Sequence, residues 1–265
     1  MTDTAQHPPA SPTPEIASVT WEDLKGALAA GWADFRAAPS FGLFFGGIYA
    51  LGGIIIYLQL LVWDQTWMIF PLAVGFPLVG PFVAVGLYEV SRRRMKGEPL
   101  DWAAVLTVIG QERRRQMPMM AFVVLFIFTV WVFLARLMVA LFFGLNPSAY
   151  FTSVADMLTS PTGLAMLVIG TVVGAVIALI LFAATVVAMP LLLEREIDFV
   201  TAMITSFNAV RENLQPMLMW GATIAVLTLA ASIPLFLGLI VVLPVLGHAT
   251  WHVYTRVVRP EGAGA

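Results

Sequence analysis

The pattern of the whole chain is set by residues 20–39, TWEDLKGALAAGWADFRAAP. Thr20 is a helix-capping residue, the aromatic Trp21 follows it directly, and an amphipathic segment then runs to Pro39. The same arrangement returns twice, from Asp101-Trp102 to Pro118 and from Asp198-Phe199 to Pro216. The aromatic residue and the proline are 18, 16 and 17 residues apart, and a long apolar run follows each proline. We interpret the pattern as one unit used three times, a helix on the membrane surface followed by a transmembrane hairpin.

Composition places the chain among helical membrane proteins. It has 265 residues, of which 60% are hydrophobic and 11% are charged, and its mean hydropathy is +0.89. A soluble domain carries about 25% charged residues. The apolar runs are continuous, near the roughly 20 residues that a helix needs to cross a bilayer, and they do not alternate as membrane strands do. We therefore expect an all-α, polytopic membrane protein. Zero cysteines exclude disulfides, thiolate metal sites and iron–sulfur clusters.

The repeated unit divides the chain into two tails and a membrane domain. Residues 1–18 are rich in proline and small residues, so we expect a disordered cytoplasmic tail. A single membrane domain spans residues 19–258, and residues 259–265 form a short C-terminal tail. The three units of the membrane domain cover about residues 19–91, 100–194 and 197–258. The six transmembrane helices are expected at about residues 41–62, 68–90, 117–143, 163–193, 217–233 and 235–254.

Small residues and prolines distinguish particular helices. In lipid, small residues allow helix backbones to approach closely. The expected packing residues form two GxxxG pairs, Gly42 with Gly46 and Gly170 with Gly174. Three prolines predict that the second transmembrane helix is kinked or partly unwound: Pro71, Pro77 and Pro81.

The positive charges predict the orientation in the membrane. With six crossings, both termini lie on one side. Of the 14 Lys and Arg residues, 13 fall on that side, and the remaining one, Arg136, lies in the third transmembrane helix. The opposite loops carry only Asp64 and Asp156. Because positive charge concentrates on the cytoplasmic side of membrane proteins, we predict that the termini and the three surface helices are cytoplasmic.

Each surface helix has an apolar stripe. In the first helix it consists of Trp21, Leu24, Leu28, Trp32 and Phe35. In the third helix it consists of Phe199, Met203, Phe207, Val210 and Leu214. Two placements fit such a stripe. The helix lies in the lipid headgroup region, or it covers the cytoplasmic end of the helix bundle.

One part of the chain carries a specific motif. It reads Gly75-Phe76-Pro77-Leu78-Val79-Gly80-Pro81, followed by Gly86-Leu87-Tyr88-Glu89-Val90-Ser91-Arg92-Arg93. With Gly31-Trp32-Ala33-Asp34-Phe35 and Gly46-Gly47-Ile48-Tyr49, it resembles the predicted bacterial integral membrane proteins of domain of unknown function 2189 (DUF2189). The resemblance covers about residues 19–258. It implies a protein of the bacterial inner membrane without an established activity. Some members that resemble this chain have been labelled cytochrome c oxidase subunits.

The histidines do not fit a catalytic oxidase core. Such a core needs several histidines on different helices to hold haem and copper. In the membrane region the chain has only His248 and His252, four residues apart on one predicted helix. One protomer therefore does not clamp a haem between two helices with histidine, and we expect no cofactor. The resemblance leaves open an accessory or assembly role beside a respiratory complex.

Four ionisable residues follow prolines near the cytoplasmic ends of the even-numbered transmembrane helices: Glu89, Glu194, His248 and His252. If the three units pack around a pseudo-threefold axis, these carboxylates and imidazoles could converge. Such a cluster could bind a divalent cation or relay protons. The alternative is that these are ordinary interfacial residues, at a depth where polar groups cost little.

Arg136 is the one charged residue deep in a predicted transmembrane helix. At 1.5 Å per residue it lies roughly 28 Å from Met117, near the far edge of a ~30 Å hydrocarbon core. It can anchor the helix by reaching the headgroups or by pairing with Asp64 or Asp156. Alternatively, it lines a pathway for a substrate or an ion.

Two basic clusters hold half of the positive charge. They are Arg92, Arg93, Arg94 and Lys96, and Arg113, Arg114 and Arg115. These clusters suffice to set the membrane topology. Each basic residue near an anionic leaflet also contributes about 1 kcal/mol of attraction. We therefore predict contact with anionic phospholipid rather than with nucleic acid.

The sequence lacks the motifs of common enzymes, among them GxSxG, HExxH and GxxxxGK(S/T), so we predict that the protein is not an enzyme. Two function classes remain. The first is a non-catalytic scaffold, assembly factor or accessory subunit that associates with other membrane proteins or with itself. The second is a small-solute or ion transporter or channel. Transporters bring polar groups to the membrane midplane, which is nearly all apolar here, and this favours the first class.

Overall fold

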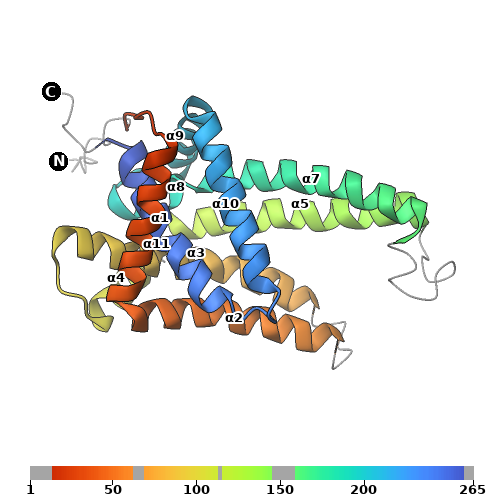
Figure 1. Cartoon of the computed structure of the whole chain (residues 1–265), viewed down its shortest axis with the longest axis horizontal. Coiled ribbons are helices and arrows are strands. Elements are labelled where there is room, and N and C mark those ends of the chain that lie inside the picture. The colour runs from red at the N-terminus through yellow and green to blue at the C-terminus, as the bar shows by residue number, and fades with distance from the viewer. Residues whose placement is uncertain (1–13, 62–68, 113–114, 145–158, 260–265) are drawn as a thin grey trace, which may run out of the picture. The chain divides into compact units, whose positions relative to one another are not determined.

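Regular structure in the described part of the chain is helical, as predicted. The computed structural model describes residues 14–61, 69–112, 115–144 and 159–259 (Figure 1). Residues 1–13 and 260–265, most of the two predicted tails, lie outside this part. Within it no strand forms, and one isolated β-bridge joins Ile16 to Val258. The helices are α1 (Trp21–Ala37), α2 (Pro39–Leu61), α3 (Ile69–Lys96), α4 (Trp102–Glu112), α5 (Met117–Phe143), α7 (Pro161–Thr185), α8 (Ala188–Glu194), α9 (Phe199–Glu212), α10 (Leu214–Ser232) and α11 (Leu239–Val257).

Three helices begin at the residues predicted to cap them. The Thr20 hydroxyl accepts a hydrogen bond from the main-chain N–H of Asp23 at 3.3 Å, and the Asp23 carboxylate accepts one from the N–H of Thr20 at 2.8 Å. Asp101 and Asp198 each accept from the N–H three residues further on, at 3.0 and 2.9 Å. These bonds satisfy N–H groups that the first helical turn leaves unpaired. The predicted starts of α1, α4 and α9 are therefore confirmed.

The helices form two compact units. Met1–Ala121 and Ala183–Ala265 make the larger unit, and Phe122–Phe182 makes the hairpin unit. The larger unit contains α1 to α4, α8 to α11, the first turn of α5 and the last residues of α7. The hairpin unit consists of the remainder of α5 and α7.

Within the larger unit, α11 is the central helix, and α1, α2 and α3 pack against it (Figure 1). Glycines make two of these crossings close. A Cβ atom at Gly31 of α1 would lie 2.6 Å from the main-chain nitrogen of Ala249, and one at Gly46 of α2 would overlap the main-chain oxygen of Ile240. Because glycine has no Cβ, the helix backbones approach more closely here than any other residue permits.

A hydrophobic cluster joins α2, α3 and α4 in the same unit. Its buried members are Ala38, Phe41, Phe45, Val83, Leu87, Val90 and Val105. Trp102 of α4 stacks on Phe41 of α2, with 4.0 Å between the ring centroids. Burial of one Phe or Leu side chain contributes about 1.5–3 kcal/mol. This cluster holds the C-terminal half of α3, which carries the polar residues of the candidate site.

The hairpin unit exposes apolar side chains on nearly all sides. No residue from Phe122 to Phe142 is buried. Two glycines of α7 face α5, because a Cβ at Gly170 would lie 3.8 Å from Cε of Met138 and one at Gly174 would lie 3.1 Å from the Trp131 ring. A helix that is apolar all round is typical of a membrane environment. The remaining predicted packing residue, Gly42 of α2, lies against the ring of Phe35.

Among the described residues, four helical segments are long and apolar enough to cross a membrane: Pro39–Leu58, Met117–Phe143, Pro161–Glu194 and Leu214–Ser232. The chain is thus a multi-pass integral membrane protein. In the described part of the chain, α3 and α11 are not among these segments, although both were predicted to cross. His248, His252 and Arg256 lower the hydropathy of α11, and the side chains of α3 are described only from Phe82 onward.

Two details of the helices differ from the predictions. α3 continues as an α-helix through Pro71, Pro77 and Pro81, so of the two predicted alternatives, a kink or partial unwinding, the unwinding does not occur. A proline removes one N–H donor, and the hydrogen bonds on either side can still continue the helix. The helix predicted at residues 163–193 divides into α7 and α8. At the break, the main-chain N–H of Val187 donates to the Ser206 hydroxyl of α9 at 3.1 Å.

Candidate functional site

Polar residues from three helices meet inside the larger unit. We call them the Asp34 cluster: Asp34 of α1, Ser91 and Arg94 of α3, and His248 and His252 of α11. Four of the five are buried, and the Arg94 side chain is about a third exposed. Burial of a polar group costs free energy unless the group is hydrogen-bonded. The pairing of these side chains therefore decides whether the contact between α1, α3 and α11 is stable.

The Asp34 carboxylate is the centre of the cluster. Its Oδ2 atom accepts a hydrogen bond from the Ser91 hydroxyl at 2.7 Å and lies 2.8 Å from Nε2 of His252. Its Oδ1 atom accepts one from Nε of Arg94 at 2.8 Å. The Ser91 hydroxyl oxygen also lies 2.8 Å from Nδ1 of His248. One carboxylate thus connects α1 to both α3 and α11.

Local helix geometry places these side chains. Gly31 lets α1 approach α11 closely, and Asp34 follows Gly31 by about one turn, on the same side of the helix. Ser91 and Arg94 are three residues apart on α3, and the two histidines are four apart on α11. Residues at these spacings lie on one helix face, so each helix presents its polar groups together.

The protons in the cluster can be counted. A carboxylate only accepts, so Nε2 of His252 carries a proton and donates it to Asp34. A serine hydroxyl has one proton, and here it is donated to Asp34. Nδ1 of His248 must therefore donate to Ser91, and this assigns the tautomer of His248. Nε2 of His248 is buried and has no hydrogen-bond partner among the described residues.

The environment keeps Asp34 ionised. Burial on its own raises the pKa of the Asp34 carboxyl, but hydrogen bonds from His252, Arg94 and Ser91 outweigh it and lower the pKa to about 2. The negative charge is therefore present at neutral pH, where it stabilises the donors that surround it.

The cluster contains a serine, histidines and a carboxylate, but its geometry is not that of a hydrolytic triad. In a triad the imidazole accepts the serine proton and so activates the oxygen. Here the proton of Ser91 goes to Asp34, and His248 donates to Ser91. Ser91 is also fully buried. The arrangement joins three helices and does not present a nucleophile.

The four predicted metal candidates have separate partners. Glu89 is buried and accepts from Nε of Arg92 at 2.7 Å and from Nε of Arg93 at 2.6 Å. Glu194 accepts from the Tyr254 hydroxyl. His248 and His252 belong to the Asp34 cluster. In the part of the chain that the structure describes, no three His, Cys, Asp or Glu side chains lie so that they could hold a metal ion.

Ion pairs neutralise four of the predicted lipid-binding arginines. Arg92 and Arg93 share Glu89 and Glu98, Arg94 pairs with Asp34, and Arg115 pairs with Glu112 at 2.7 Å. Lys96 has no ion pair among the described residues and is exposed. Arg113 and Arg114 lie outside the described residues. Among the described members of the two clusters, Lys96 therefore carries the charge that remains for a lipid.

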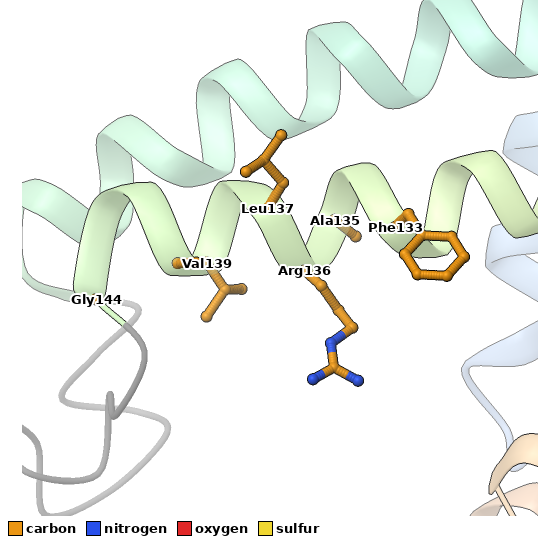
Figure 2. A pocket seen from close by; sticks show the side chains of 7 residues that line it. Phe133, Ala135, Arg136, Leu137, Val139 and Gly144 are labelled. Atoms are coloured by element: carbon orange, nitrogen blue, oxygen red, sulfur yellow. The ribbon is translucent and has the colours of Figure 1, made fainter.

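Arg136 lies in the hairpin unit and is exposed. Figure 2 shows its guanidinium extending away from α7, whereas Leu137 points toward α7. Its surroundings on α5 are apolar and include Phe133 and Val139. Among the described residues it has no ion pair. Asp64 and Asp156, its predicted partners, lie outside the described residues, so that pairing stays a prediction.

Asp34, Ser91 and the pairing of Arg94 were not predicted from the sequence. The available signal was the position of Asp34 on the same face of α1 as Ala27 and Gly31. A carboxylate on a face of small residues indicates a buried partner. Of the predicted stripe, Leu24 and Phe35 are buried on this face, whereas Trp21 and Trp32 lie on the exposed side, at 41% and 44% exposure.

One family model matches the central part of the chain. Residues 69–194 match the model of a family described as predicted integral membrane protein (DUF2189). This match covers α3 to α8 and confirms the resemblance over that segment. No curated protein and no solved structure matches the chain.

Proposed function

We propose that this integral membrane protein with a DUF2189 region is a non-catalytic scaffold, assembly factor or accessory subunit of a complex in the bacterial inner membrane. The supporting observation is a contrast between two surfaces. The carboxylates of Asp34 and Glu89 and the hydroxyl of Ser91 are held in ion pairs and hydrogen bonds in the larger unit, whereas the hairpin unit offers an accessible apolar surface. Such a surface suits lipid and other transmembrane helices, and not a polar substrate.

The α5–α7 hairpin offers a place for a partner helix. A groove of about 360 Å³ runs between the two helices. It is lined by Trp131, Ala135, Met138, Val139, Met166, Leu167, Gly170, Thr171 and Gly174. Helices associate in lipid where small residues allow close packing and where a hydroxyl offers a hydrogen bond. In the groove, Gly170 and Ala135 are the small residues and Thr171 has the hydroxyl.

A six-span topology accompanies this proposal, with α3 and α11 crossing in addition to the four apolar segments. The order of the helices supports it, since a short capped helix precedes a pair of longer helices at α1, α4 and α9. The charge pattern supports cytoplasmic termini, because Arg136 is the one basic residue away from the predicted cytoplasmic side.

Transport of a small solute or ion is the second candidate. Arg136 favours it, because an exposed cation in an apolar segment is typical of a pathway. Arg136 is, however, the one charged residue in Met117–Phe143. A pathway built on it requires groups from the loops beyond the described residues.

The groove provides the test that separates the candidates. Gly170→Leu fills the groove, so we expect it to abolish isolation of a stoichiometric complex from native membranes. Val168→Leu is the matched control, because Val168 is 65% exposed on α7 and does not line the groove. An unchanged complex in Gly170→Leu contradicts docking in the groove. Substrate-dependent flux by the purified protein in proteoliposomes favours transport instead.

A further inference from the structure

α1 and α9 each expose large apolar residues on the side that faces away from the protein. On α1 the buried side includes Leu24, Ala27, Gly31 and Phe35, while Trp21 and Trp32 are 41% and 44% exposed. A helix at a water surface normally buries its large apolar residues and exposes polar ones. The two exposed tryptophans of α1 therefore call for an apolar contact that the described part of the chain does not supply.

α9 repeats this arrangement with different residues. Its buried side includes Ala202, Ser206 and Ala209. Its exposed side carries Val200, Ile204 and Phe207, which are 46%, 56% and 41% exposed. α4 also exposes a large apolar residue, because Leu106 is 45% exposed while Val105 beside it is buried.

Each of these helices leads directly into an apolar segment. Ala38 alone separates α1 from α2, Asn213 alone separates α9 from α10, and residues 113–116 separate α4 from α5. α2, α5 and α10 contain three of the four segments that can cross a membrane. The C-terminal ends of α1, α4 and α9 therefore lie within a few residues of the membrane boundary.

From this placement we infer that α1, α4 and α9 lie in the headgroup layer of the bilayer, with Trp21, Trp32, Leu106, Ile204 and Phe207 inserted among the lipids. Interfacial helices bury their apolar side about 5–10 Å into the boundary between headgroups and acyl chains. Tryptophan is enriched at this depth because its ring is apolar and its N–H is polar. The partner of these three faces is thus the lipid surface itself, distinct from the protein partner proposed for the α5–α7 groove.

Charge near the membrane boundary supports lipid as the occupant. Arg36 lies in the last turn of α1, with its guanidinium 5.8 Å from the centre of the Trp32 ring. Arg211 lies in the last turn of α9, one turn after Phe207. Both arginines thus sit where a helix meets a membrane segment, the depth of the lipid phosphates. Their long side chains can reach these phosphates while the neighbouring aromatic ring stays in lipid.

Single spin labels test the inference on the full-length protein. The chain has no cysteine, so each cysteine substitution gives one labelling site. Trp32→Cys and Phe207→Cys place labels on the proposed lipid sides of α1 and α9. Ala33→Cys and Glu212→Cys are the matched controls, because both residues are exposed and lie about 100° and 140° further round their helices. None of the four residues is buried, so the fold should tolerate all four changes.

The measurement compares collisions of each label with oxygen, which dissolves in lipid, and with a water-soluble nickel chelate. The protein is reconstituted in vesicles of phosphatidylethanolamine and phosphatidylglycerol. We expect the labels at residues 32 and 207 to collide mainly with oxygen and the control labels mainly with nickel. Nickel collisions at residues 32 and 207 equal to those of the controls would overturn the inference. Screening from both reagents would also overturn it, because a protein surface would then cover these faces.

Discussion

The carboxylate of Asp34 lies 2.8 Å from Nε2 of His252, although 218 positions separate the two residues in the chain. This contact fastens α1 to the C-terminal half of α11. Ser91 and Arg94 of α3 bind the same carboxylate. Because these partners come from distant segments, the cluster forms only when the larger unit is folded. Its contribution should therefore appear in the stability of that unit.

Asp34→Asn should destabilise the protein strongly. Removal of one partner from a buried ion pair costs about 3–5 kcal/mol, because the other charge is left without compensation. Asparagine also turns an N–H donor toward groups that are themselves donors. We expect a loss of about 3 kcal/mol, seen as a lower Tm of the detergent-solubilised protein by circular dichroism.

Glu22→Gln is the control for this change. Glu22 forms an ion pair with Lys25 on the same helix, but its side chain is 78% exposed. An exposed pair contributes at most about 1 kcal/mol, so the Tm should hardly change. Equal Tm values for the two variants would show that the Asp34 cluster does not hold the helices together.

The difference in stability between the wild type and Asp34→Asn should depend on pH in one direction. The folded protein lowers the pKa of Asp34 from 3.8 to about 2, so the carboxylate stabilises the fold above pH ~4. As the pH falls from about 4 to about 2, Asp34 takes up a proton and this contribution is lost. Unfolding temperatures at pH 7, 5, 4 and 2.5 should therefore show a constant difference down to about pH 4 and a smaller one at pH 2.5. A difference that already shrinks between pH 7 and 5 would point to a histidine instead.

The helix boundaries could be predicted because they depend on neighbouring residues. Thr20 and Asp198 cap their helices through bonds that span three residues, and α5 runs from Met117 to Phe143 as predicted. The pairing of Glu89 with Arg92 and Arg93 was also open to prediction, since spacings of three and four place them on one helix face.

The Asp34 cluster could not be predicted in the same way. Its members come from α1, α3 and α11, and nothing local specifies which helices cross. The inward side of α1 depends on Gly31 fitting against Ala249, a contact between residues far apart in the chain. The sequence pattern singled out the large residues of α1, of which Leu24 and Phe35 are buried on the side of Asp34 and the two tryptophans are exposed. The two histidines were predicted to form a metal-binding or proton-relay cluster with Glu89 and Glu194. In the structure their partners are Ser91 and Asp34.

Gly31→Ala should separate α1 from α11. Its new Cβ would lie 2.6 Å from main-chain atoms of both Ala249 and Val245, which cannot rotate away. Overpacking of this kind costs about 1–3 kcal/mol. Gly26→Ala on the same helix is the control, because its Cβ would meet only the end of the Arg256 side chain, at 3.4 Å. Alanine is the better helix former, so Gly26→Ala should stabilise the protein by up to about 1 kcal/mol. Chemical denaturation in detergent should give the two variants opposite signs.

Lys96→Gln should reduce the anionic phospholipid that copurifies with the protein. Lys96 follows the ion-paired arginines at the end of α3, and its own charge is not paired among the described residues. One basic residue contributes about 1 kcal/mol of attraction to an anionic leaflet, so binding should weaken about fivefold. Lys25→Gln is the control, because Glu22 already neutralises Lys25 at 2.6 Å. Native mass spectrometry of both variants measures the retained phosphatidylglycerol. Equal losses in the two variants would mean that the overall charge, and not the site at Lys96, attracts the lipid.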